Sequence, residues 1–508
     1  MRAISLLIVC LAACGPDDAV GGAPNGGAGG EPTGGVGGAT GGSGGSAGAA
    51  GASMAGSGGS NVGGIGGAAG AAGGSTGGAG SGGAAGEPPE PPASCGDASR
   101  AYTVASTMLD ASFVVAEADR FWGGGAPRTP VAVDPDSGEV FVAFTRAEGD
   151  ARSVVIAAEG GAAADAISIP DAVIGGVAVT NDGVAALVFD PNSDVDMRMW
   201  AAVARFGADG MELFNTDLFR SPNLEDEGTK GAPSTARLGY VASSDVLIPY
   251  FGHTQRYDDG VRHQGGYLAT VSGSGEQELL EGWFGSHNLD QRMLIDGDRV
   301  AVLGLGDAYP KGIFFSYIDN PRTHVIYRLA ADGVGTTNGQ LGGLVDMGDA
   351  ILSPFITNRS VAQDLDAGQW PDIDEMISMQ ISEAAAMGTD MGILPIPKSD
   401  LPDGDLEPVW LMPDAGAGAR LGRLKSARYG TAELILVAWA EITGSDRSPT
   451  YTYYTMVVDR DGAVCQPKTQ LDPAHAFNAG DDIVAKPDGS LIWANVQNDQ
   501  VHIVTLTP

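Results

Sequence analysis

One pattern of apolar and polar positions recurs from residue 129 to the end of the chain. Each copy has a short apolar stretch, a turn containing Asp, Asn or Gly, and a second apolar stretch. Turns of this kind permit the positive φ angles at which antiparallel strands reverse, so each copy predicts a β-hairpin. Seven copies occur, at residues 129–145, 175–190, 238–252, 292–306, 342–356, 422–440 and 481–496.

Most of these hairpins are followed by two further alternating stretches. After the second hairpin they are MRMWAAVARF and GMELFNTDLF, and after the fifth they are EMISMQIS and GILPIP. Four antiparallel strands per unit predict an all-β β-propeller, in which each blade covers the apolar face of its neighbour. We predict seven four-stranded blades, with six or eight blades or tandem β-sandwiches as the alternatives.

The two ends of this region suggest how the ring closes. Only one strand, VHIVTLTP, follows the seventh hairpin, so the last blade lacks a strand. Residues 102–118 form an apolar stretch that precedes the first hairpin and has no blade of its own. We therefore expect the propeller to close by pairing of its N- and C-terminal segments.

The N-terminus has the pattern of an export signal. Arg2 precedes an apolar run that is too short to span a bilayer, and Leu11-Ala12-Ala13 is a small-residue cleavage site. Leu-Ala-Ala-Cys resembles the lipobox of bacterial lipoproteins, in which the cysteine becomes the lipidated mature N-terminus. The resemblance implies a signal peptide at 1–13 and lipidation of Cys14. An ordinary secretory peptide, in which Cys14 is incidental, is the alternative.

Residues 14–94 predict a disordered tether that ends in a Pro-rich spacer. Gly, Ala, Ser and Thr dominate it, and such low-complexity sequence cannot build a core. A Gly-rich coil of this length reaches about 45 Å, enough to hold residues 95–508 away from a membrane. Lipobox and tether together resemble lipoproteins of myxobacterial type. By resemblance to enterobacterial lipoprotein sorting, Gly15 rather than Asp after the cysteine favours the outer membrane of the cell envelope.

Charge and cysteine content agree with an exported protein. The formal net charge is −35, which would repel nucleic-acid phosphates, so DNA and RNA are not expected partners. Two cysteines remain beyond the tether, Cys95 and Cys465, and an even pair in an exported domain predicts one disulfide. Two free thiols are the alternative.

Candidate chemistry concentrates in the third and fourth repeats. Three of the six histidines lie between residues 253 and 287, beside carboxylates and arginines. Such groups bind a divalent cation, act as acid and base, or hold an anionic ligand. The candidate ligand-binding or catalytic residues are His253, Arg256, His263, His287, Asp290 and Arg292. Solvated loop residues or structural interior residues are the alternative.

A weaker metal candidate lies in DPNSDVD. Asp190, Asn192, Asp194 and Asp196 alternate like the first half of a calcium loop, but Val195 occupies the glycine position and the final Glu is absent. An ordinary polar connection explains this segment as well. The sequence identifies no cofactor, and a divalent cation is the only class that these residues suggest.

Three functions remain open at this stage, and the third is an envelope structural protein without a ligand. The first is a lipid-anchored binding or scaffold protein whose propeller-end loops recognise a protein, glycan or small molecule. The second is an extracytoplasmic propeller hydrolase or lyase with a His/Asp site in the channel. No contiguous catalytic motif occurs in residues 95–508, which favours a protein that is not an enzyme.

Overall fold

The computed structural model divides the chain into two units, Met1–Ala84 and Ala85–Pro508. It describes residues 95, 101–110, 112, 115, 127–191, 198–221, 228–256, 262–284, 288–306, 312–328, 340–357, 390–399, 401, 406–412, 419–430, 433–445 and 448–508. The predicted signal peptide, the lipidation site and nearly all of the tether lie outside these residues. Among the described residues, no helix has the length and apolar character needed to cross a membrane.

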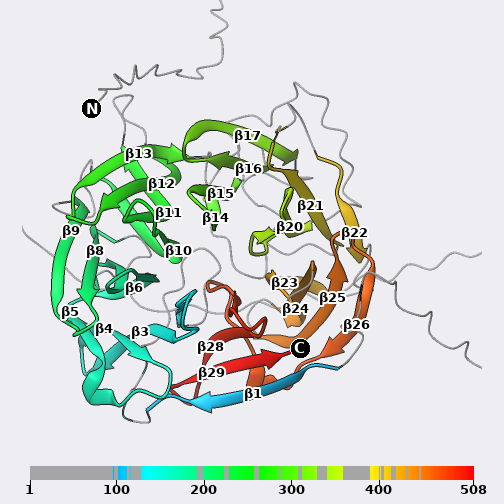
Figure 1. The fold of residues 1–508 in the computed structure, drawn as a ribbon, viewed down its shortest axis with the longest axis horizontal. Coiled ribbons are helices and arrows are strands. Elements are labelled where there is room, and N and C mark those ends of the chain that lie inside the picture. The colour runs from blue at the N-terminus through cyan, green and yellow to red at the C-terminus, as the bar shows by residue number, and fades with distance from the viewer. Residues whose placement is uncertain are drawn as a thin grey trace, which may run out of the picture. The chain divides into compact units, whose positions relative to one another are not determined.

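The second unit is a β-propeller of seven sheets arranged around an axis (Figure 1). Blade 1 comprises β2 (Val131–Val133), β3 (Val140–Glu148), β4 (Ala151–Ala158) and β5 (Ile167–Pro170). Blade 2 comprises β6 (Val173–Thr180), β7 (Gly183–Phe189), β8 (Trp200–Gly207) and β9 (Glu212–Arg220). Blade 3 comprises β10 (Lys230–Val241), β11 (Val246–Arg256), β12 (Arg262–Ser272) and β13 (Gln277–Phe284). Blade 4 comprises β14 (Asn288–Asp296), β15 (Arg299–Gly306), β16 (Gly312–Tyr317) and β17 (Asn320–Arg328).

The remaining three blades follow the same plan with small departures. Blade 5 comprises β18 (Gln340–Leu341), β19 (Val345–Asp346), β20 (Ala350–Thr357), β21 (Asp390–Pro397) and β22 (Val409–Met412). Blade 6 comprises β23 (Arg420–Arg428), β24 (Leu434–Ser445), β25 (Ser448–Asp459) and β26 (Val464–Gln470). Blade 7 comprises β27 (Val484–Ala485), β28 (Leu491–Gln497), β29 (Gln500–Thr507) and β1 (Thr103–Met108). Two short 3-10 helices, η2 (Ala163–Asp165) and η4 (Pro473–His475), lie in connections.

The predicted fold is confirmed, including the way in which the ring closes. All seven hairpins are the first and second strands of a blade. β1 pairs antiparallel with β29 from Thr103↔Thr507 to Met108↔His502, so the earliest described strand completes the last blade. The predicted disulfide joins Cys95 to Cys465 of β26 and connects blade 7 to blade 6 at this seam.

Blade 5 corrects one detail of the predicted strand order. GILPIP lies in β21, which is the third strand rather than the fourth, and β22 supplies the fourth. β20 and β21 pair without a break from Ala350↔Pro397 to Thr357↔Asp390. EMISMQIS lies outside the described residues. Apolar alternation predicts that a stretch is a strand, but it does not identify the neighbouring strand.

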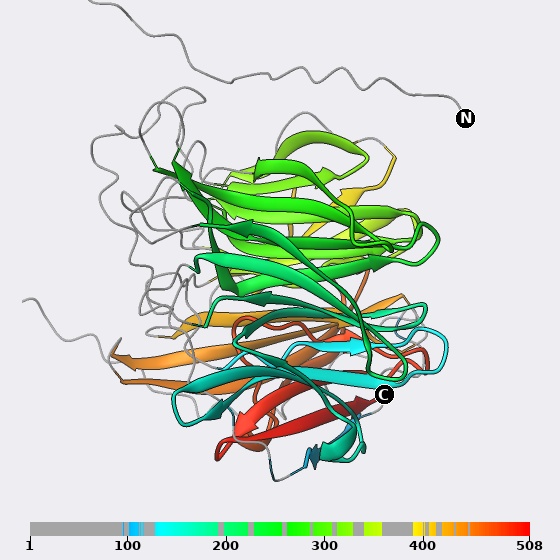
Figure 2. The same cartoon turned by 90° about the vertical axis from the view of Figure 1, so that its left-hand side faces the viewer.

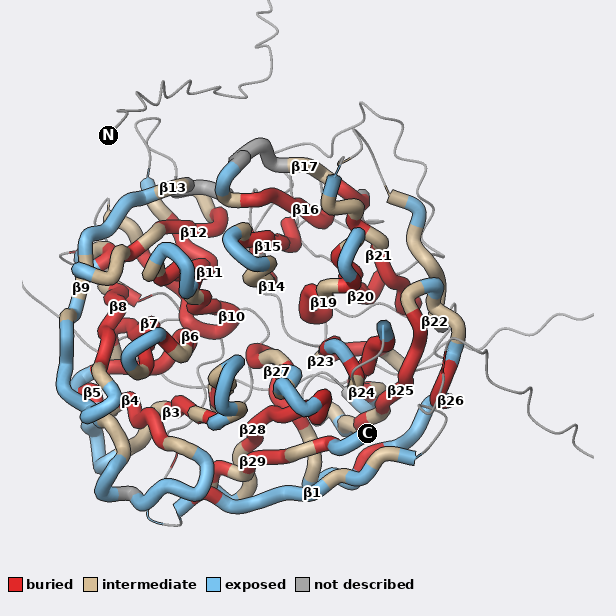
Figure 3. Tube along the Cα trace, viewed as in Figure 1, coloured by how far each residue is buried: buried red, intermediate tan, exposed pale blue. Residues whose placement is uncertain are grey.

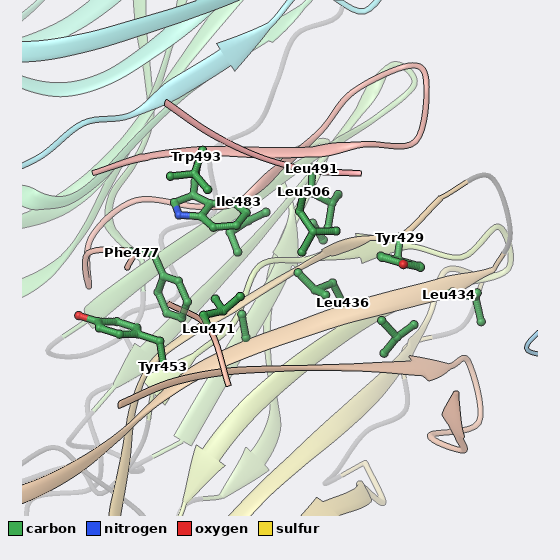
Figure 4. Packing of buried hydrophobic residues seen from close by; sticks show 14 of the residues in the cluster. Tyr429, Leu434, Leu436, Tyr453, Leu471, Phe477, Ile483, Leu491, Trp493 and Leu506 are labelled. Carbon is green, nitrogen blue, oxygen red and sulfur yellow. The ribbon is translucent and has the colours of Figure 1, made fainter. Parts of the chain in front are cut away.

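Nonpolar side chains fill a layer between each pair of neighbouring blades. Between blades 6 and 7, for example, Leu436 of blade 6 belongs to the same buried cluster as Leu491 and Leu506 of blade 7 (Figure 4). The outermost strands β1 and β9 are largely exposed, whereas the strands between them and the axis are mostly buried (Figure 3). Because each layer buries apolar surface of two sheets, no blade is stable by itself.

Strand direction gives the propeller two distinct ends. Because successive strands in a blade are antiparallel, all turns between first and second strands lie at one end of the ring, the turn end (Figure 2). Connections from the second to the third strand, and from one blade to the next, lie at the other end, the crossover end. A residue's place near the end of a strand therefore tells which end of the ring it occupies.

Candidate functional site

Asp290 and Arg292 lie on β14, the innermost strand of blade 4. Both are buried, and their side chains form an ion pair. Asp290 also accepts a hydrogen bond from the backbone N–H of Leu341 at 3.0 Å, and Arg292 Nη2 donates to the Leu341 carbonyl at 2.8 Å. The two predicted residues therefore tie blade 4 to β18 of blade 5.

His253 lies on β11 and is buried in the layer between blades 2 and 3. Its Nδ1 is 3.2 Å from the carbonyl oxygen of Gly265, and its ring meets that of Tyr267 edge to face. Its Nε2 has no hydrogen-bond partner among the described residues. Burial lowers the pKa of His253 to about 4, so the imidazole is neutral at pH 7.

Arg256 and His263 lie at the crossover end of blade 3. Arg256 is exposed at the end of β11, and His263 is half-buried near the start of β12. Gln255 pairs with His263 and Arg256 pairs with Arg262, so both residues flank the same strand reversal. His287 lies outside the described residues. The structure thus places two predicted residues at the axis, one in a layer and two at the rim of the crossover end.

Asp482 is a central residue that the sequence interpretation missed. It precedes β27 of blade 7, and its carboxylate accepts two hydrogen bonds from Arg237 of β10, at 2.6 and 3.0 Å. Arg292 Nε lies 3.6 Å from Asp482 Oδ1. Burial opposes ionisation, but Arg237, Arg292 and Lys425 together hold the pKa of Asp482 well below its usual range. One carboxylate therefore joins cations from blades 3, 4 and 6.

A third ion pair joins the start of blade 1 to the start of blade 7. Arg128, just ahead of β2, donates from Nε to Asp481 at 2.6 Å. Its Nη2 donates to the backbone carbonyls of Gly175 and Ala236 at 2.9 and 3.0 Å, and its Nη1 donates to the Pro233 carbonyl. This one side chain therefore connects blades 7, 1, 2 and 3.

Lys425 is the fourth basic residue at the axis, besides Arg128, Arg237 and Arg292. Its side chain is 1% exposed on β23, and Nζ donates a hydrogen bond to the Ala479 carbonyl at 2.6 Å. Burial, followed by the positive charge of Arg292, lowers the pKa of Lys425 to about 7. We call the seven ionisable residues at the axis the channel cluster: Arg128, Arg237, Asp290, Arg292, Lys425, Asp481 and Asp482.

Irregularities in the innermost strands direct these groups to the axis. The pairing register shifts between Ile174 and Gly176 in β6, between Ala232 and Arg237 in β10, between Asn288 and Gln291 in β14, and between Gly422 and Lys425 in β23. A bulge bends its strand and re-aims the side chains beside it. Arg237 and Lys425 are the first paired residues after their bulges, and Arg292 is the second.

No metal site is found in the part of the chain that the structure describes. No group of three or more His, Cys, Asp or Glu side chains there is arranged to hold an ion. In the weak calcium candidate, Asp190 is buried at the end of blade 2's second strand. Asn192, Asp194 and Asp196 lie outside the described residues, so the structure does not test that candidate.

A signal for the channel cluster is present in the repeats. Arg237, Arg292 and Asp482 each stand directly before the apolar stretch of an innermost strand, whereas Lys425 lies within such a strand, between Leu424 and Ser426. A charged residue at one repeated position is a pattern that an internal alignment of the hairpins would detect. Its partners lie on other blades, so the pattern predicts the position of the charges but not their pairing.

No protein-family model matches the chain, and the search of curated proteins found no relative. Among solved structures, the subtype N10 neuraminidase-like protein of A/little yellow-shouldered bat/Guatemala is 9% identical with a TM-score of 0.36, covering 70% of this chain and 96% of that one. The WD40 domain of SCAP from fission yeast is 7% identical with a TM-score of 0.36, covering 80% and 87%. The α-L-arabinanase of Penicillium chrysogenum, complexed with arabinobiose, is 10% identical with a TM-score of 0.34, covering 70% and 98%. At this distance the likenesses carry no functional argument.

Proposed function

We propose that this chain is a binding or scaffold protein, held at the cell envelope by a lipid on Cys14, with the crossover end of the propeller as its recognition surface. Its ligand would be a protein, a glycan or a small molecule. The lipobox-like N-terminus and the long Gly-rich segment support envelope attachment. Because Gly15 rather than Asp follows the cysteine, resemblance to enterobacterial lipoprotein sorting makes the outer membrane the proposed location.

One observation favours binding over catalysis: the channel's charged groups are used to hold blades together. Asp290 is paired with Arg292, Asp481 with Arg128, and Asp482 with Arg237. A general acid or base needs a proton-transfer group that is free to contact substrate. Rigid closure of the axis leaves the connections between strands as the variable part of the molecule, and such connections commonly carry binding residues.

Lipid attachment is tested by metabolic labelling of cells that express the full chain. We expect an alkyne fatty acid to label the wild type and the Cys10→Ser variant, because Cys10 would leave with the signal peptide. Cys14→Ser should lose the label. Equal labelling of the Cys14→Ser chain would overturn the proposed anchor.

Recognition is tested with the lipidated full chain in vesicles, probed with peptidoglycan sacculi, a glycan array and an outer-membrane protein fraction. We expect at least one probe to bind, and binding to weaken about tenfold in Arg256→Ala/His263→Ala, since both residues lie at the crossover end. Lys486→Ala at the turn end is the matched control. Absence of binding to every probe, or an equal loss in the control, would contradict the proposal.

A second candidate, a propeller hydrolase or lyase, is favoured by His253 alone. Its neutral ring has an unpartnered Nε2 while Nδ1 faces a backbone carbonyl, which is the protonation state that a general base requires. Hydrolytic release of reducing sugar from envelope polysaccharides by the wild type, but not by His253→Gln, would favour this candidate. Equal rates in the two proteins would exclude a catalytic role for His253.

A further inference from the structure

The channel cluster contains unequal numbers of basic and acidic groups. Three basic residues have acidic partners: Arg128 pairs with Asp481, Arg237 with Asp482, and Arg292 with Asp290. Lys425 has no carboxylate partner of its own among the described residues, and its hydrogen bond goes to a neutral backbone carbonyl. A buried cation without a counter-charge is costly, so this point in the channel favours a negative charge.

Two nitrogen atoms near this point have spare hydrogen-bonding capacity. Arg292 Nε is buried and donates no hydrogen bond, since its 3.6 Å separation from Asp482 Oδ1 exceeds hydrogen-bonding distance. Lys425 Nζ carries three N–H groups when protonated, and Ala479 O accepts only one of them. Both nitrogens are donors, so the missing partner is an acceptor.

Space for such a partner lies beside Asp482. Its side chain keeps 26% of its surface exposed, although burial is the largest influence on its pKa. A carboxylate that is deep inside the ring and still exposed borders space that solvent reaches. Arg292, at 2%, and Lys425, at 1%, are almost completely buried, so a partner for their spare donors has to be small.

We propose that the axial channel binds a small monovalent anion, such as a halide or formate, between Lys425 Nζ and Arg292 Nε. The ion completes the charge balance of the cluster and accepts the spare hydrogen bonds of both side chains. This site is distinct from the recognition surface at the crossover end, and neither proposal depends on the other.

Anion binding in the channel is coupled to protonation of Lys425. The charged groups that act on Lys425 are Arg292 and Arg237, which oppose its protonation, and Asp482 and Asp290, which favour it. An added anion favours protonation too, so at pH 8.5 the anion binds together with about one proton. Below pH 6 Lys425 is already charged, and anion binding takes up no further proton. Affinity therefore falls about tenfold for each unit of pH above 7 and is constant below 6.

The first experiment locates the ion in crystals of the wild-type protein grown in sodium bromide. We expect an anomalous bromide peak between Lys425 and Arg292, and a weaker or absent peak when formate is added in excess. A channel that contains only water at saturating bromide would overturn the proposal. This measurement needs no variant and does not depend on any ligand of the propeller ends.

The second experiment measures bromide affinity from the thermal stability of the full chain between pH 5.5 and 9. We expect the pH profile above in the wild type and at least tenfold weaker binding in Lys425→Met, which keeps the length of the side chain without its charge. Lys468→Met is the control, because Lys468 lies on the perimeter strand β26 and pairs with Glu441. A flat pH profile in the wild type would contradict the proposal even if Lys425→Met failed to fold. So would equal bromide affinity in Lys425→Met and the wild type.

Discussion

In the layer between blades 6 and 7, Leu436, Val457 and Leu506 belong to one cluster of buried, mostly nonpolar side chains. At the axis, the charges of Arg237, Arg292 and Lys425 act on the carboxylate of Asp482. Both regions are buried and both join neighbouring blades. The layer is held by apolar burial, which depends on area and volume and tolerates many combinations of side chains. The axis depends on particular charges at particular positions.

This difference determines how each region responds to a substitution. A shortened side chain in a layer leaves a small cavity, and the surrounding residues relax into part of it. Removal of one charge at the axis leaves its partners buried without compensation, and no rearrangement of nonpolar neighbours supplies the missing charge. We therefore expect a single substitution to be tolerated less well at the axis than in a layer.

The largest effect is expected for Asp482→Asn. The amide keeps the shape of the side chain but removes the charge that Arg237 and Arg292 share, at a cost of about 4 kcal/mol in the free energy of unfolding. Urea denaturation at pH 7 measures this change. A loss below about 1 kcal/mol would show that the axial charges are individually dispensable and would remove the distinction between the two regions.

A somewhat smaller effect is expected for Leu436→Ala, which opens a cavity in the layer between blades 6 and 7. Truncation of a fully buried leucine typically costs about 3 kcal/mol. The same denaturation experiment measures it. Leu436→Met keeps the volume and should cost less than about 1.5 kcal/mol. Similar losses for the two variants would indicate that the layer, like the axis, requires one specific side chain.

His253 is a titratable residue buried inside a layer. The pH dependence of stability therefore tests whether a layer, unlike the axis, excludes charge. Burial lowers its pKa from 6.5 to about 4, so the unfolded chain takes up the proton first as the pH falls. Its contribution is fully present above pH 6.5 and is lost as the pH falls through about 4. We expect the wild type to lose about 2–3 kcal/mol more than His253→Gln between pH 7 and 4. Parallel stability profiles of the two proteins would contradict the burial of a neutral imidazole.

The smallest effect is expected for an ion pair at the perimeter. Arg220 and Asp217 on β9 lie 2.8 Å apart, but their side chains are 58% and 52% exposed. Water and salt screen such a pair, so Asp217→Asn should change the free energy of unfolding by less than about 1 kcal/mol. If this variant lost as much as Asp482→Asn, burial would not explain the strength of the axial pairs.

The candidate site was only partly predictable from the sequence. Asp290 and Arg292 were identified because they lie beside histidines just ahead of an apolar stretch, and the structure places both at the axis. Asp482 and Lys425 also lie in or just before the innermost strands of their own repeats, but no group of histidines like that at residues 253–287 marks them. The charged residues at the axis come from blades that are far apart in the chain, so the local sequence around one of them does not show which others it meets.

Local sequence determined the strands, the turns between them, the number of hairpins and the segment that closes the ring. These features follow from side-chain periodicity and turn chemistry, which act over a few residues. Tertiary structure alone decided that Asp482 meets Arg237, that Arg128 reaches the carbonyls of blades 2 and 3, and that His253 is neutral. The ion pairs form and the side chains lose their water only when blades distant in sequence are brought together around one axis. These features are therefore properties of the closed ring and cannot be derived from a single repeat.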